Sequence, residues 1–234
     1  MRRLLATVSC DIRLQFRNGF YYAAGLVALF WMVSLSQAPA ASLSWLMPPF
    51  LMSNLLINTF YFVAGLVLLE KGEATLAAQI VTPLRTWEYL ASKIITLTLL
   101  SLIENLIIVA AGYGLDFNPL FLLIGIISAA AIYTLTGFIS VARYDSINEY
   151  LFPSAFYTLF FTPPFLDYFG LLESWLFYLH PIQAPLLLLK AAFMPVETWQ
   201  WLYGLLYSVI WIALFYLWSR RTFYRFITTA EGAR

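Results

Sequence analysis

The sequence predicts an all-α protein that crosses a membrane several times, and two observations support this fold class. The 234-residue chain is 62% hydrophobic and only 11% charged, whereas a soluble domain carries about 25% charged residues. Its apolar residues also gather in runs close to the ~20 residues that a helix needs to cross about 30 Å of hydrocarbon. No polar stretch is long enough to fold as a separate soluble domain. We therefore expect residues 1–234 to form a single transmembrane domain.

The N-terminal residues 1–19 predict a helix that lies along the membrane surface. Leu4, Val8, Ile12 and Phe16 recur every fourth residue, and the charged residues occupy the other faces. This pattern is typical of an interfacial helix with its axis in the headgroup plane. The alternative is a polar N-terminal tail.

Six apolar stretches follow, and we expect each to be one transmembrane helix. Their approximate bounds are residues 20–37, 45–69, 94–113 and 120–141, then a span that begins near Tyr150, and residues 201–218. With the N-terminus inside, twelve of the 13 lysines and arginines fall on the cytoplasmic side and only Lys190 falls outside. This positive-inside asymmetry places both termini in the cytoplasm and the protein in the inner (cytoplasmic) membrane.

The segment between the fifth and sixth spans, residues 167–199, is too hydrophobic for a solvated loop. Prolines divide it into apolar pieces that are each too short to cross the membrane. We expect a re-entrant helical hairpin in the outer leaflet, which is tolerated where protein rather than lipid surrounds it. His180, which stands beside Pro181, is predicted to be a turn residue rather than a proton carrier.

Residues 70–93 form the longest polar interruption between two apolar runs. Leu76, Ile80 and Leu84 have helical spacing, which predicts one or two short amphipathic helices at the cytoplasmic membrane surface. Pro83 interrupts the pattern because it lacks a backbone donor and clashes with the preceding turn. Such a segment can present a shaped face to a partner.

The second cytoplasmic loop, residues 142–149, is short. Ser146 and Glu149 have the spacing of a capping box, so the fifth span is predicted to begin a new helix there. Two interpretations remain open for this loop, a plain capped turn and a contact with a cytoplasmic partner.

The search for chemistry finds no catalytic or metal-binding pattern. His180 and Cys10 are single, no HExxH motif is present, and no GxxxxGK[ST] phosphate loop exists. A net charge of +1 argues against nucleic acid as a partner. Glu104 lies within a predicted span, where a carboxyl group is costly and marks either a functional site or an interhelical hydrogen bond.

The complete pattern resembles the permease subunits of ABC-2 type (type V) ABC exporters, and the resemblance covers essentially the whole chain. A basic interfacial helix precedes six spans, and the segment after span 2 reads EKGEATL…VTPLRTWEYLASK. A proline-rich piece, YLHPIQAPLLLLKAAF, precedes span 6. Within the family, the chain is most similar to small bacterial permeases of the fluoroquinolone-export type.

The resemblance implies a function and a set of partners. Residues 72–82 would be a coupling helix that docks on an ATPase, and two ATPase subunits would hold the ATP and Mg, so that this chain binds no cofactor. A second copy or a homologous permease would complete the pathway within the lipid. The implied ATPase-coupling residues are Glu70, Gly72, Glu73, Leu76, Ile80, Pro83, Glu88, Lys93, Asp145 and Glu149. The candidate pathway-lining residues are Asn54, Asn58, Glu104 and Phe160.

The implied cargo is a hydrophobic or amphiphilic molecule such as a drug, because the predicted lining carries so few charges. Alternatives are a haem- or lipid-exporting permease of the same fold, and a six-span membrane scaffold without a transport cycle. An intramembrane enzyme is disfavoured because no catalytic pair is present.

Overall fold

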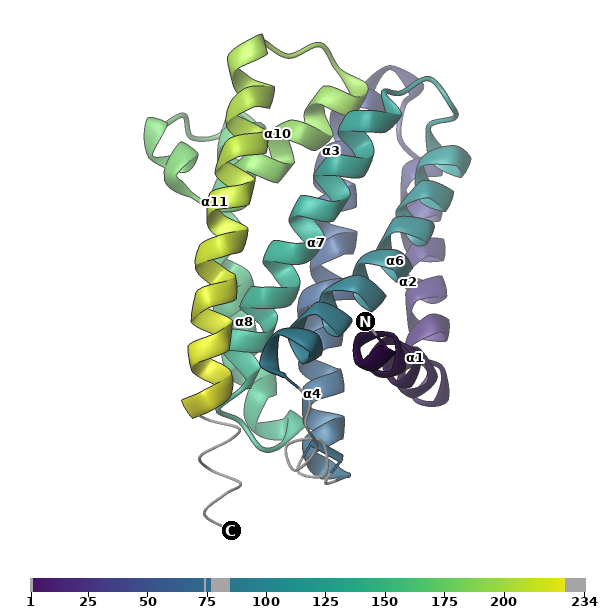
Figure 1. Cartoon of the computed structure of the whole chain (residues 1–234). Coiled ribbons are helices and arrows are strands. Elements are labelled where there is room, and N and C mark those ends of the chain that lie inside the picture. Colours follow the sequence, from purple (N-terminus) through teal and green to yellow (C-terminus); the bar gives the residue numbers. More distant parts are fainter. Residues whose placement is uncertain (1, 74, 77–84, 226–234) are drawn as a thin grey trace.

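The computed structural model describes residues 2–73, 75–76 and 85–225, and every regular element within these ranges is a helix (Figure 1). The all-α prediction is therefore confirmed for the described part of the chain. Two of the predicted coupling residues, Ile80 and Pro83, lie outside the described residues, as does most of the predicted coupling helix.

The chain begins with two helices that meet at a sharp bend. The helices α1 (Arg2–Arg17) and α2 (Phe20–Ser36) are inclined by 66° to each other. Gly19 sits at the bend with φ of 77°, a left-handed conformation that glycine adopts without steric cost. In Figure 1, α1 crosses beside the lower part of α6 while α2 rises along the bundle.

The second span is one continuous helix with irregular turns inside it. It comprises η1 (Ala40–Ser42), α3 (Leu43–Leu55), the π-helical η2 (Leu56–Tyr61) and α4 (Phe62–Gly72). Wide π-helical turns inside α-helices are uncommon and often mark functional places. Here η2 lies midway along the span and packs against α7.

Three more long helices complete the bundle: α6 (Thr86–Gly112), α7 (Pro119–Val141) and α11 (Thr198–Phe223). Together with the second span, four described helices are long and apolar enough to cross a membrane, and the bent α1–α2 pair brings the number to five. The protein is thus a multi-pass membrane protein.

The predicted fifth span is shorter than expected. Helix α8 (Ile147–Phe160) has 14 residues, or about 21 Å at 1.5 Å per residue, and Pro163 opens a separate helix, α9 (Pro163–Tyr168). Because proline cannot continue a helix without losing a hydrogen bond, the Pro163–Pro164 pair sets this break. The count of six spans therefore stays a prediction.

The region before the last span consists of short helices. The 3₁₀-helix η3 (Trp175–Leu179) is followed by α10 (Gln183–Phe193), which packs against α7, α11 and α3. The four leucines of α10 are buried, so protein surrounds this apolar run as expected. The re-entrant hairpin stays a prediction.

His180 occupies the turn between η3 and α10. Its Nδ1 accepts the backbone N–H of Ile182 at 3.2 Å, and its Nε2 lies 2.9 Å from the carbonyl oxygen of Phe160. These two contacts require a neutral ring with the proton on Nε2, and burial lowers the pKa of His180 to about 4. The prediction of a turn residue agrees with this geometry.

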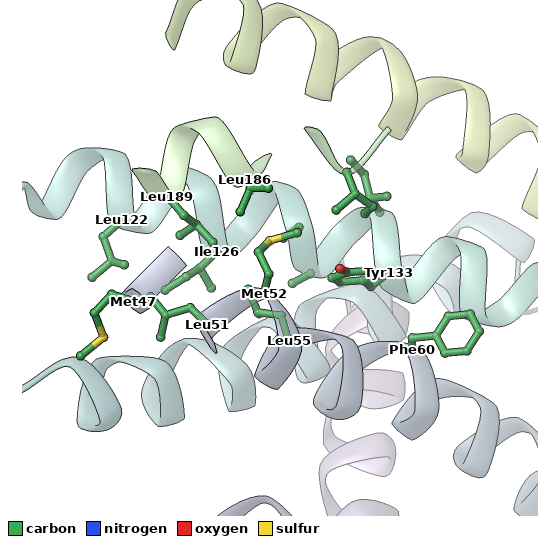
Figure 2. Close-up of a cluster of buried hydrophobic side chains, with 14 of the residues drawn as sticks. Met47, Leu51, Met52, Leu55, Phe60, Leu122, Ile126, Tyr133, Leu186 and Leu189 are labelled. Carbon is green, nitrogen blue, oxygen red and sulfur yellow. The ribbon is translucent and has the colours of Figure 1, made fainter. Parts of the chain in front are cut away.

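The largest core cluster lies where α3, α7 and α10 meet (Figure 2). Met47, Leu51 and Leu55 of α3 face Ile126 of α7, and Leu189 of α10 closes the layer. At Gly125 of α7 an added Cβ would lie 2.8 Å from a Leu189 methyl carbon, so the glycine permits the close approach of α10.

Candidate functional site

The end of α4 is the most highly connected polar place in the described structure. Glu70, Lys71 and Glu73 stand within four residues, yet each binds a different neighbouring element. We call this part of the bundle, where α4 ends and α6 and α8 begin, the basal end. The three connections are described in turn.

Glu70 belongs to a buried ionic cluster, here called the junction cluster: Asp11, Glu70, Tyr89, Ser92 and Lys93. The ammonium group of Lys93 lies 2.5 Å from Asp11 Oδ1 and also pairs with Glu70. Tyr89 donates to Glu70 at 2.6 Å, and Ser92 donates to Asp11 at 2.5 Å. The cluster thereby joins α1, α4 and α6.

Because the junction cluster is buried, the stability of the protein is sensitive to substitutions in it. The side chains of Asp11, Glu70 and Lys93 are each at most 2% exposed. Removing such groups from water is costly, and mutual attraction offsets the cost only when the remaining polar atoms are also hydrogen-bonded. Two carboxylates face one ammonium group. The hydrogen bonds that Tyr89 and Ser92 donate to these carboxylates therefore also help to offset the cost of burying them.

Lys71 connects α4 to the turn between α7 and α8. Its ammonium group donates to the carbonyl oxygens of Ala142 at 2.7 Å and Tyr144 at 2.8 Å, and it lies 3.4 Å from Asp145 Oδ1. Two backbone carbonyls fix the ammonium group more firmly than the exposed carboxylate does. The turn after α7 therefore follows the position of α4.

Glu73 connects α4 to the end of α1. A single guanidinium nitrogen of Arg17 donates to both carboxylate oxygens of Glu73, at 2.6 and 2.7 Å. The pair is exposed, so its contribution to stability is at most about 1 kcal/mol. Its geometric consequence is larger, because it fastens α1 to the chain at the point where α4 ends.

The orientation of α1 follows from the same contacts. Asp11 and Gln15 are buried against α6, where Gln15 donates to Thr96 at 2.9 Å. Ile12 and Phe16, by contrast, are 40% and 62% exposed. Part of the apolar stripe therefore faces away from the protein, as expected for a helix whose outer side contacts lipid.

The predicted coupling residues divide into exposed and buried groups. Gly72, Glu73, Asp145 and Glu149 are exposed and accessible to a partner. Leu76 is fully buried in the core, which removes it from any docking face that this conformation presents. Glu70, Glu88 and Lys93 are also buried. Glu88 accepts the backbone N–H of Arg85 at 2.9 Å and so caps the start of α6.

Sequence reasoning missed Asp11, Arg17, Lys71 and Tyr89 as members of this arrangement. The spacing of Asp11 and Gln15 is a usable signal, since polar residues four apart on an otherwise amphipathic helix share one face. No local signal identifies Lys93 as the partner of Asp11, because the two residues are 82 positions apart in the chain.

Three of the four predicted pathway residues meet in the interior. Asn58 of η2 donates to Asn54 Oδ1 at 3.2 Å and to the carboxyl group of Glu104 on α6. All three are at most 5% exposed. We call them the buried amide cluster. Phe160 lies elsewhere, with its ring against Phe161 and His180.

The buried amide cluster is incompletely satisfied. Within the described residues, Asn54 Nδ2, Asn58 Oδ1 and Glu104 Oε1 have no hydrogen-bond partner. Unpaired polar atoms of this kind are costly in a low-dielectric interior. The interhelical hydrogen bond that was one of the two interpretations of Glu104 is present, and the unpaired atoms leave the functional interpretation open as well.

Comparison with known proteins now identifies the class of the chain. Residues 2–231 match the fluoroquinolones export permease protein family. This chain belongs to that family. Fluoroquinolones export permease proteins of two Mycobacterium tuberculosis strains, CDC 1551 / Oshkosh and ATCC 25618 / H37Rv, are each 32% identical to it, with 99% of both chains covered.

Membership confirms the expected resemblance and fits the fold. A permease of this family is a transport subunit rather than an enzyme, and it agrees with the several apolar helices seen here. Among the described residues no group of three or more histidine, cysteine, aspartate or glutamate side chains has a metal-binding arrangement.

Proposed function

We propose that this chain is the membrane-embedded subunit of an ATP-driven exporter in the cytoplasmic membrane. It would pair with a second permease, a copy or a homologue, and with two ATPase subunits that hold the ATP and Mg. The cargo would be a hydrophobic or amphiphilic drug of the kind named for its Mycobacterium tuberculosis relatives, the fluoroquinolones. Six spans with both termini in the cytoplasm would place the basal end on the ATPase side.

One observation supports this mechanism above the others. The end of α4, which leads into the predicted coupling segment, is bonded to α1, α6 and the α7–α8 turn by three separate sets of polar contacts. A displacement of this point would be carried to three elements at once. Such an arrangement suits a protein that converts the movement of a cytoplasmic partner into movement of its helices.

In the proposed cycle the ATPase contacts the exposed surface around Gly72, Glu73, Asp145 and Glu149. Closure of the two ATPases pushes on the end of α4. Lys71 then moves the α7–α8 turn, and the junction cluster moves α1 and the lower part of α6. The buried residues Glu70, Glu88 and Lys93 act in this scheme by holding the helices together rather than by touching the ATPase.

A bulky residue at Gly72 tests the docking surface without disturbing the core. An added Cβ at Gly72 meets no atom of the described residues within 4 Å, so we expect Gly72→Trp to add an indole on this exposed surface and to abolish co-purification of the neighbouring ATPase. Gly25→Trp is the matched control, because Gly25 of α2 is likewise open. The measurement is ATPase recovered per permease after purification in mild detergent.

The proposal is contradicted if the wild-type protein retains no ATPase, or if Gly72→Trp binds it as well as Gly25→Trp does. Thermal unfolding of each purified permease provides the folding control. Leu76 is less suitable for this test, because a polar residue at this buried position would unfold the core.

A further inference from the structure

A cavity of about 530 Å³ lies between η2, α7, α8 and α11. Its volume falls within the range of about 300–1,000 Å³ that holds drug-sized ligands. Seven aromatic side chains dominate its walls: Phe60, Tyr157, Phe160, Phe161, Trp211, Phe215 and Trp218. The cavity lies within one protomer and does not include the buried amide cluster.

The α11 wall of the cavity is a row of nearly parallel rings. The Trp211 and Phe215 rings have centroids 5.0 Å apart, and the Phe215 and Trp218 centroids are 6.5 Å apart, with 26° between the planes in both pairs. Tyr157 and Phe160 of α8 line the cavity as well. Aromatic faces on both helices favour a flat aromatic ligand, which can stack at ring distances of about 4.5–7 Å.

One cation stands at the basal end of this cavity. Arg143 is the only charged residue among the described residues that line it, and none of them is acidic. Its guanidinium group donates to the Tyr157 hydroxyl. A guanidinium has five N–H donors in a planar fork, so others remain for a carboxylate, and such charge-assisted bonds are about twice as strong as neutral ones.

The position of Arg143 is tied to the proposed coupling segment. Lys71 at the end of α4 donates to the carbonyl oxygens of Ala142 and Tyr144, the two residues on either side of Arg143. Displacement of α4 therefore shifts the backbone that carries the guanidinium group. A ligand held by Arg143 would experience that shift directly.

The α8 wall is lightly attached. Only Tyr150 and Ser154 of this helix are buried, and hydrogen bonds between Tyr150 and Ser140 and between Thr158 and Tyr61 join it to α7 and η2. Its outer face is apolar and exposed, with Phe152 at 75% and Phe156 at 63%. A helix that is held by few buried contacts can move at a small free-energy cost.

We propose that this cavity is a cargo site for a flat aromatic molecule with a carboxylate, whose rings stack between α8 and α11 while Arg143 binds the acid group. The assignment deepens the proposed export function and relies on it for the role of the cargo. It also explains why a single positive charge stands at the end of an otherwise uncharged, largely aromatic cavity.

The test measures binding to the purified permease in lipid nanodiscs without ATPase, so that a failure of ATPase docking cannot affect it. Norfloxacin, a flat aromatic carboxylate, is compared with its ethyl ester, which lacks the anionic group. We expect Arg143→Gln to weaken binding of norfloxacin by about tenfold or more, as loss of a charge-assisted pair implies, and to leave binding of the ester nearly unchanged.

Two further variants complete the design. Phe160→Ala removes one stacking surface and should weaken binding of both the acid and the ester. Arg220→Gln is the matched control. Arg220 is exposed near the basal end of α11 but does not line the cavity. This substitution should therefore change the affinity for neither the acid nor the ester. Melting temperatures of all variants confirm that each one is folded.

Three results would overturn the assignment: no binding of norfloxacin to the wild-type protein, equal loss of acid and ester affinity in Arg143→Gln, or full affinity in Phe160→Ala. The export proposal survives any of them, because cargo could then bind elsewhere while ATPase docking at Gly72 remains intact.

Discussion

Lys93 shows how one buried side chain links three elements. It stands near the start of α6, and its ammonium group bonds Asp11 of α1 and Glu70 of α4. Without it, two carboxylates would face each other in a site that water does not reach. The residue was predicted to belong to the coupling machinery, but its burial gives it a positioning role rather than a surface role.

Lys93→Met should therefore be strongly destabilising. Removing one partner of a buried ion pair costs about 3–5 kcal/mol, which corresponds to a fall in melting temperature of at least about 6 °C for a chain of this size. Lys190→Met is the control, since Lys190 forms no ion pair with the described residues and lies over the Tyr168 ring. Tryptophan fluorescence during heating in detergent measures both.

The cause is tested by neutralising the whole cluster. In Asp11→Asn/Glu70→Gln/Lys93→Met no buried charge is left unpaired, so the triple variant should regain most of the lost stability. If the triple variant is less stable than Lys93→Met, the loss arises from packing rather than from unpaired charge.

At the scale of elements, Gly137 sets how closely α7 approaches the second span. An added Cβ there would lie 2.7 Å from the carbonyl oxygen of Phe60 and 2.6 Å from a Val63 methyl carbon. The first of these contacts is to backbone, so the π-helical η2 would have to shift. The close approach of α7 depends on this glycine.

We expect Gly137→Ala to destabilise the protein by about 1–3 kcal/mol, the usual cost of overpacking a core. Gly25→Ala makes the same change on the open side of α2, where no atom of the described part of the chain lies within 4 Å, and should be neutral or stabilising by up to about 1 kcal/mol. Thermal unfolding of both variants measures the two changes in stability. Equal effects of the two changes would show that the α7–η2 contact is not the cause.

The elements also show what the sequence can and cannot predict. The ranges 20–37 and 120–141 agree with α2 and α7 to within a residue or so, because unbroken apolar runs between polar ends leave little choice. The polar residues before Ile94 were assigned to the membrane surface, yet Thr86 to Lys93 are the first turns of α6. Lys93 is buried there because Asp11 and Glu70, which are distant in sequence, neutralise it, whereas Glu88 is buried where it caps the start of the helix.

The sequence likewise indicated part of the candidate site and missed the rest. The segment that begins at residue 70 was singled out by its place after a span, and an interhelical hydrogen bond was one of the two open interpretations of Glu104, although Asn58 was not identified as its partner. The aromatic cavity was not predicted, since its rings come from η2, α8 and α11, which are distant from one another in the sequence. Arg143 had no distinguishing mark in the sequence apart from its position in a predicted cytoplasmic loop.

At the scale of the whole molecule, the basal end behaves as a junction between the surface helix and the bundle. The helix α1 runs across the bundle in Figure 1 and is held by Asp11, Gln15 and Arg17. The first two contacts are buried in α6, whereas Arg17–Glu73 is exposed at the end of α4. That exposed pair can therefore be exchanged without altering the core.

Exchanging the charges of Arg17 and Glu73 tests whether α1 moves with α4 during transport. Arg17→Glu and Glu73→Arg each place two like charges together, so each should lower ATP-dependent efflux of norfloxacin several-fold while changing stability by no more than about 1 kcal/mol. The double variant restores the pair with its polarity reversed and should recover efflux. Arg13→Glu, on the same helix and also exposed, should leave efflux near the wild-type level. The readout is cellular drug accumulation at equal permease abundance.

If the double variant exports as poorly as the single ones, the individual charges matter rather than their pairing, and α1 need not follow α4. Full recovery would mean that the surface helix, the end of α4 and the bundle respond to the ATPase as one connected unit.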